Sequence, residues 1–378
     1  MARATGWLAA SFAQRHGDNP WLDLLRTVAI VLVLLRHGQR ALLHGVDPAT
    51  YSFFDYVALN GWVGVDLFFV LSGYLLGAKL LGPRRGAGVS LYLQDRARRI
   101  LPAYLAVLTL TVAGVFPGFA VAGQDLTWRV IYHLLFLQDV LPSNINVVFW
   151  SLGVEVKYYL ALPLLVWNLL RLDSLGARVA MLAGILGAGV ALRSGLYMQM
   201  GQPVAYPTFW QDLRSPFYAS LDALLIGTGV ALLTTAGRQL APANARRLLA
   251  VVTLVAVIWL ASGDFMGTIT IWDVSAQPVA VALLCGAAVW AAASLRGLPL
   301  FAEPVFRIGA RLSYSLYLVH FPLIPLALGL SAADRGLLFW PVFLGLSLGV
   351  SALIYLGIER PFLARRAGAA TGDVAAQR

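Results

Sequence analysis

The sequence predicts an all-α, polytopic membrane protein with about ten transmembrane helices and one short re-entrant or interfacial helix. Hydrophobic residues make up 59% of the 378 residues and charged residues only 12%. Soluble domains are about 45–50% apolar and about 25% charged. The mean hydropathy of +0.75 agrees with a membrane protein. So few charged side chains cannot cover a water-facing surface, and a water-soluble protein is excluded.

The basic residues predict the topology. Lys and Arg outnumber Asp and Glu by 28 to 18, a net charge of +10. In a soluble protein this excess would suggest nucleic acid, but beside a membrane it marks the cytoplasmic side. With ten spans and both termini in the cytoplasm, the outer segments hold only Arg129, Arg214 and Arg335. We therefore expect no nucleic-acid partner. We also expect no cleavable signal, because residues 1–20 lack an apolar core.

The first apolar run, residues 22–43, contains Asp23, Arg26 and His37. An ionisable residue within a span costs about 2.5–3.5 kcal/mol, so each is a functional candidate. Arg26 and His37 are 11 positions apart, which places them on one helix face with a rise of about 16 Å. Asp23 and Arg26 equally suit a helix end that is anchored by snorkelling. His37 lies deeper, in the predicted outer half, and histidine is the side chain best suited to exchange a proton near neutral pH.

The second run, residues 58–81, carries Asp66 at about the depth of His37. This carboxylate is expected to orient an imidazole or to pair with Arg36 or Arg40. An ion pair that only fixes helix packing is an equal alternative. Three glycines of the run permit close approach of a neighbouring helix: Gly61, Gly64 and Gly73.

A basic segment precedes the third run, residues 100–120. Arg96 and Arg99 are three residues apart and share a helix face. Two forked guanidinium groups on one face form a good phosphate site, although basic residues beside a membrane commonly reflect topology alone. The next run, residues 128–141, is too short to cross a bilayer and predicts the re-entrant or interfacial helix.

The fourth span, residues 150–170, opens with Trp150 and places Glu155 in the predicted outer half; Lys157 faces elsewhere on the helix. Glu155 is therefore expected near His37. Six further runs complete the ten spans: residues 178–197, 215–235, 247–262, 276–295, 311–330 and 336–358. Within them, His320 is interpreted as a packed helix residue more readily than as a base. The single Cys285 excludes a disulfide framework, and the five histidines show no metal-ligand spacing, so no metal is expected.

These residues, in order, resemble the acyltransferase-3 family of polytopic membrane O-acyltransferases. The blocks that carry the resemblance are Arg26 with His37, Gly64–Tyr74, Arg96–Arg99 with Pro102 and Tyr104, Trp150–Glu155, Leu221–Leu224, Ser315–Pro322 and the terminal Ile358–Phe362. The resemblance implies that His37 matches the family's essential histidine and that Arg26, Arg96 and Arg99 match its basic positions. Val156 follows Glu155 where the family often has a second acid, which weakens a mechanism based on two carboxylates.

The resemblance implies transfer of an acyl group, often acetyl, from cytoplasmic acyl-CoA to a hydroxyl of an extracytoplasmic or lipid-linked sugar. His37 is the expected base, with Asp66 or Glu155 as its partner, and Arg26, Arg96 and Arg99 are expected to hold the acyl-CoA phosphates. Acyl-CoA is then a substrate, and no permanently bound cofactor is expected. We expect one acyltransferase domain, residues 1–366, in the bacterial inner membrane and a disordered tail, residues 367–378. A proton-coupled transporter or flippase of a lipid or glycolipid is the alternative, and the oligomeric state stays open.

Overall fold

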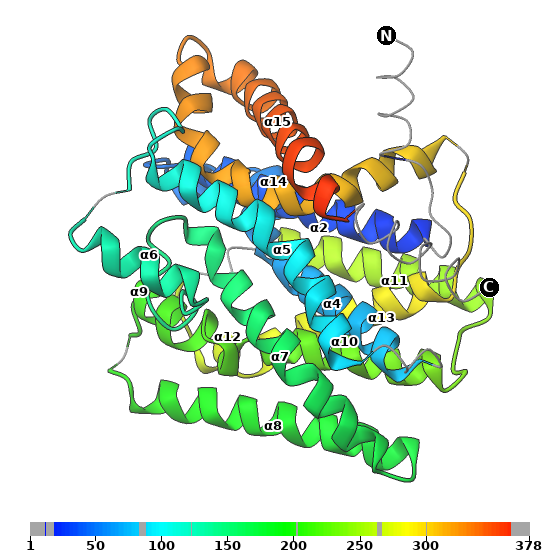
Figure 1. Cartoon of the computed structure of the whole chain (residues 1–378). Coiled ribbons are helices and arrows are strands. Elements are labelled where there is room, and N and C mark those ends of the chain that lie inside the picture. The colour runs from blue at the N-terminus through cyan, green and yellow to red at the C-terminus, as the bar shows by residue number, and fades with distance from the viewer. Residues whose placement is uncertain are drawn as a thin grey trace.

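The computed structural model describes residues 12, 19–82, 88–121, 123–201, 203–262, 267–299 and 301–363. Within these ranges the chain is helical and contains no strand (Figure 1), so the predicted all-α class is confirmed. The predicted tail, residues 367–378, lies outside the described residues. The longer helices are α2 (Pro20–Leu42), α3 (Phe53–Leu59), α4 (Val63–Leu81), α5 (Val89–Val112), α6 (Leu126–Leu134), α7 (Trp150–Leu170), α8 (Leu175–Gln199), α10 (Leu221–Thr235), α11 (Pro242–Ala261), α13 (Ala276–Ala293), α14 (Ala302–Leu330) and α15 (Arg335–Ile354).

A helix occupies each of the ten predicted runs, and seven described helices are long and apolar enough to cross a membrane. The chain is a multi-pass membrane protein. The three helices below this threshold are α2, α5 and α10. Helices α2 and α5 contain too many charged residues to meet this threshold, and α10, with 15 residues, is too short. The count of ten spans and the cytoplasmic termini stay predictions.

Helix α4 lies at the centre of the helix bundle, where it packs against α2, α7, α10 and α13. Its crossing with α10 depends on two glycines. A Cβ on Gly73 would lie 2.2 Å from the Leu224 carbonyl oxygen, and a Cβ on Gly227 would lie 2.2 Å from the Val70 carbonyl oxygen. The close approach predicted at Gly73 is therefore confirmed. By contrast, α8 lies along one edge (Figure 1), with only 6% of its most apolar stretch buried.

A proline in the middle of α14 leaves a backbone carbonyl free to bind the segment before α7. Pro322 lacks an N–H group, so it cannot donate to the Leu318 carbonyl one turn earlier. Asn146 Nδ2 donates to that carbonyl instead, at 3.1 Å. The adjacent Tyr317 hydroxyl donates to the Val148 carbonyl oxygen at 2.8 Å. These contacts hold the α14 side chains in a fixed position at the bundle centre.

The predicted short element forms the nine-residue helix α6, about 13 Å long, which is too short to cross a bilayer. The chain then turns sharply at Phe136, whose φ is 57°. Behind this turn Asp139 is fully buried, accepts from the Phe217 backbone N–H at 3.0 Å and is paired with Lys157. The segment therefore packs into the bundle rather than crossing it, while its position relative to a membrane stays a prediction.

Candidate active site

A cavity of about 430 Å³, here called the basic pocket, lies among α2, α4, α5, α7 and α14. Five basic residues and two acidic residues line it: Arg26, Lys79, Arg96, Arg99, Arg311, Asp23 and Glu155. The structure thus brings together the three arginines that the sequence singles out, although they lie on two helices 70 residues apart in the chain. An excess of cationic groups in one cavity suits a polyanionic ligand.

The three predicted arginines differ in their partners. Arg26 is paired with Asp23 at 3.0 Å, and Arg99 is paired with the fully buried Glu359. Arg96 makes no hydrogen bond or ion pair with any residue that the structure describes, and its Nε is buried without a partner. Arg96 is therefore the guanidinium group whose donors are available to a ligand.

Glu155 also lies in the basic pocket, and the expectation that it lies beside His37 is wrong. Its carboxylate accepts from Ser72 Oγ at 2.9 Å and from the Tyr159 hydroxyl at 2.5 Å. Trp150 starts α7 at a second cavity, but Glu155 is five residues, about 7.5 Å, further along the helix. Ser151 and Leu152, which directly follow Trp150, line the first cavity together with Glu155, so this side of α7 faces the basic pocket.

The second cavity, about 260 Å³, is here called the aromatic pocket. His37 lines it together with three arginines and six aromatic residues: Arg36, Arg40, Arg214, Trp62, Trp150, Tyr206, Trp210, Tyr317 and Phe321. Helix α2 contributes to both pockets, since Arg26 lies in one and His37 in the other. The predicted separation of these two residues along one helix thus corresponds to two distinct cavities.

The partner of His37 is another histidine rather than a carboxylate. His320 Nε2 lies 3.0 Å from His37 Nδ1, and His320 is fully buried. His320 Nδ1 lies 3.0 Å from the Leu316 carbonyl oxygen. That oxygen can only accept, so we assign the proton of neutral His320 to Nδ1, and its Nε2 accepts. His37 Nδ1 then donates, which leaves His37 Nε2 with its lone pair available for a proton.

Asp66 binds Arg214 and not the residues that the sequence suggested. Arg214 Nη2 lies 3.0 and 2.8 Å from the two Asp66 carboxylate oxygens, and both residues are buried. Arg36 instead donates to the Leu59 carbonyl oxygen. The predicted pairing of Asp66 with Arg36 or Arg40 is therefore wrong, because Arg214, 148 residues away in the chain, is brought next to it. Asp66 is not among the described residues that line the aromatic pocket, but its partner Arg214 is.

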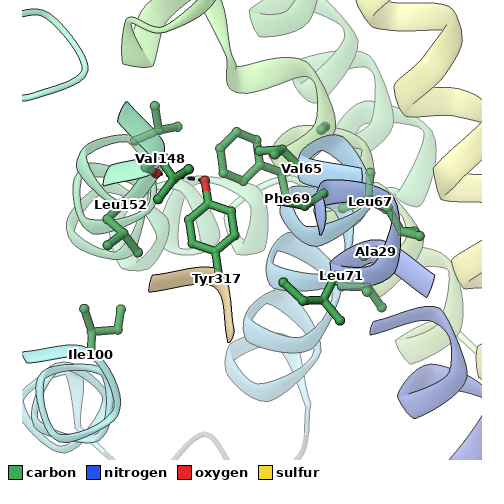
Figure 2. Close-up of a cluster of buried hydrophobic side chains, with 14 of the residues drawn as sticks. Ala29, Val65, Leu67, Phe69, Leu71, Ile100, Val148, Leu152 and Tyr317 are labelled. Carbon is green, nitrogen blue, oxygen red and sulfur yellow. Dashed lines mark hydrogen bonds between the residues drawn. The ribbon is translucent and has the colours of Figure 1, made fainter. Parts of the chain in front are cut away.

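Two residues line both pockets: Val65 and Tyr317. Figure 2 shows the Tyr317 ring between Val148 and Leu152 on one side and Val65 and Phe69 on the other. The Tyr317 hydroxyl is held by the Val148 carbonyl oxygen at 2.8 Å and by Ser151 Oγ at 2.6 Å. The Tyr317 ring therefore lies between the two cavities and lines both.

Comparison with known proteins assigns the chain to a family. The family model for the acyltransferase-3 domain, described as an acyltransferase domain, matches residues 19–356. The chain belongs to the acyltransferase-3 family. This confirms the resemblance stated from the sequence blocks, and the match includes His37, His320 and all the arginines of both pockets. No solved structure matches the chain at a significant level.

Several curated relatives of this chain carry O-acetyltransferase in their names. It is 29% identical to YrhL of Bacillus subtilis, a candidate peptidoglycan O-acetyltransferase, over 92% of this chain and 55% of that protein. It is 31% identical to the peptidoglycan O-acetyltransferase OatA of Listeria monocytogenes, over 38% of this chain and 23% of that protein. It is 32% identical to the exopolysaccharide production protein ExoZ of Rhizobium meliloti, over 26% of this chain and 32% of that protein. The chain thus spans about half the length of YrhL and less of the other two.

The sequence argument missed three residues of this site. His320 belongs to the Ser315–Pro322 block, one of the blocks that carry the family resemblance. This block was the sequence feature that could have identified His320 as a partner of His37. Tyr317 belongs to the same block, but its position between two cavities depends on how α14 crosses α4 and α7. Arg214 was counted as a residue of an outer segment, and no pattern in the sequence connects it with Asp66.

Proposed function

We propose that the protein is an O-acyltransferase of the bacterial inner membrane. In this proposal it moves an acetyl group from cytoplasmic acetyl-CoA to a hydroxyl of an extracytoplasmic or lipid-linked sugar. The observation that carries the proposal is the contact of two unlike cavities at Tyr317, one basic and one containing a histidine with an available ring nitrogen. The O-acetyltransferase names of the relatives support the choice of acetyl and of a polysaccharide acceptor.

The basic pocket is the proposed donor site. Acyl-CoA carries its phosphates at the nucleotide end, and arginines bind phosphate through charge-assisted, bidentate hydrogen bonds. Arg96 has the available donors, whereas Arg26 and Arg99 add positive charge to the cavity while paired. The neutral pantetheine arm then extends toward Tyr317, over a distance comparable to the rise of about 16 Å between Arg26 and His37.

The aromatic pocket is the proposed acceptor site, with His37 as general base. His37 Nε2 removes the proton from the acceptor hydroxyl while its oxygen attacks the thioester carbonyl. The C–S bond breaks, the CoA thiolate leaves, and the proton held by His37 returns to the sulfur. His320 Nε2 accepts from His37 Nδ1 throughout, so it fixes the ring and stabilises the transient imidazolium.

Mass spectrometry of cell-envelope glycans and glycolipids tests the proposal. Cells that lack the protein would receive the wild type, His37→Ala or His44→Ala; His44 is an exposed histidine just beyond the same helix and serves as the matched control. We expect a mass increase of one acetyl group with the wild type and His44→Ala only. General-base help is worth about 10²–10⁴-fold, so His37→Ala loses the product without loss of the fold.

A second measurement separates the enzyme from the alternative of a proton-coupled transporter or flippase. The purified acyltransferase is expected to bind coenzyme A, and binding should weaken in Arg96→Gln. If no glycan mass changes and coenzyme A does not bind, the enzyme assignment is refuted in favour of transport. A wild-type acetylation level in cells with His37→Ala would refute the role of this histidine.

A further inference from the structure

The aromatic pocket has an unbalanced charge. Three guanidinium groups line it, and none of its described lining residues is a carboxylate. Asp66 neutralises Arg214 from outside the cavity. Arg40 is exposed, and its guanidinium carbon lies 5.3 Å from the centre of the Tyr206 ring. Arg40 makes no hydrogen bond or ion pair with another residue in the described part of the chain, so no protein acceptor occupies its N–H donors.

The aromatic side chains of this pocket form a continuous surface. The Trp150 and Trp210 rings meet edge to face with centroids 5.1 Å apart, and Tyr206 stacks on Trp210 at 6.2 Å. The guanidinium of Arg214 lies 5.7 Å from the Trp62 ring and 5.5 Å from the Trp150 ring. Such amphipathic rings pack against the C–H face of a sugar while fixed arginines bind its charged substituents.

A π-helix positions one side of this surface. η4 (Phe209–Arg214) ends with a bond from the Ser215 backbone N–H to the Trp210 carbonyl oxygen at 2.8 Å, which spans five residues. The wide turn brings Trp210 and Arg214, four residues apart, to the same cavity. Insertions of this kind are frequent at functional sites. The backbone of η4 therefore places Trp210 and Arg214 at the cavity, together with the residues that α2 contributes.

We propose that the acceptor is an anionic sugar, whose carboxylate or phosphate group is bound by Arg40 beside Tyr206 while its ring lies on Trp150 and Trp210. This inference rests on the proposed function, because it assigns the acceptor class to the pocket that contains His37. A bidentate Arg contact selects planar carboxylate or phosphate oxygens over neutral hydroxyls. A carboxylate and a phosphate offer the same recognition chemistry, so the experiment must distinguish them.

Binding of small sugars to the purified, detergent-solubilised protein provides the test. Glucuronic acid, glucose 1-phosphate and glucose would be titrated by saturation-transfer NMR, into the wild type, Arg40→Gln, Arg40→Lys and Arg335→Gln. Arg335 is exposed and belongs to a segment predicted to lie outside, so it is the matched control for loss of one positive charge. Coenzyme A would be titrated into the same samples to assess the donor site separately.

We expect at least one charged sugar to bind about tenfold more tightly than glucose, and Arg40→Gln to remove this preference. Arg40→Lys should restore part of it, because the charge returns without the fork, and Arg335→Gln should change nothing. A preference for glucuronic acid identifies a carboxylate, and one for glucose 1-phosphate identifies a phosphate. Equal binding of all three sugars, or an unchanged preference in Arg40→Gln, would refute the inference. Failure of coenzyme A to bind would refute the proposed function while leaving the anion site standing.

Discussion

Replacement of His320 tests the contact between the two histidines. In His320→Leu the hydrogen bond from His37 Nδ1 is lost, although Phe321 still packs edge to face on the His37 ring at 5.3 Å. Loss of one buried hydrogen bond costs about 1–3 kcal/mol. If the whole effect falls on the transition state, it corresponds to a decrease of about 5- to 150-fold in kcat. The KM for acetyl-CoA should not change, because neither histidine lines the basic pocket.

Steady-state transfer from labelled acetyl-CoA to the acceptor found in the glycan experiment would provide kcat and KM. His320→Gln is the conservative control, because its amide oxygen can accept from His37 and should recover part of kcat. Thermal unfolding of each purified variant would establish that it is folded. If folded His320→Leu keeps kcat within twofold of the wild type, His320 does not position the base. An equal decrease for Leu and Gln, with lower thermal stability in both, would indicate a packing role only.

Three further predictions concern other parts of the molecule. Arg96→Gln should raise the KM for acetyl-CoA about tenfold at constant kcat, because a ground-state phosphate contact is lost. Arg98→Gln, at an exposed neighbouring position, is the control. Equal KM values in both variants would mean that Arg96 does not bind the donor and reflects membrane topology alone. Tyr317→Ala should remove the ring that lies between the two pockets, so propionyl- and butyryl-CoA should react at rates close to that of acetyl-CoA. An unchanged preference for chain length would show that this ring does not limit the length of the acyl group. Gly227→Ala should lower the free energy of unfolding by about 1–3 kcal/mol, measured by chemical denaturation, because its new Cβ would overlap α4, whereas Gly229→Ala on the same helix should be neutral.

Continuous apolar runs predicted the positions of the long helices, because each run is a local property of the chain. Arg26 and His37 were likewise placed correctly on one helix, since their spacing is fixed by helical geometry alone. The partners of these residues could not be predicted in the same way. Asp66 meets Arg214 and His37 meets His320 across separations of 148 and 283 residues. Tertiary packing brings α2 next to α14 and η4 next to α4, and no short-range pattern encodes it.

Glu155 shows why depth in a membrane is a weak guide to contact. Its position in the first turns of α7 suggested a carboxylate near His37, yet its side chain lines the basic pocket, whereas Trp150 of the same helix lines the aromatic pocket. His37, the proposed base, instead contacts a second imidazole, to which we assign the neutral tautomer that suits the Leu316 carbonyl. A neutral partner avoids the cost of an additional buried charge in a region that already holds three arginines. None of the described residues that line the aromatic pocket is a carboxylate; in the proposed mechanism this leaves the His37 lone pair available for the acceptor hydroxyl and Arg40 available for the proposed anionic group.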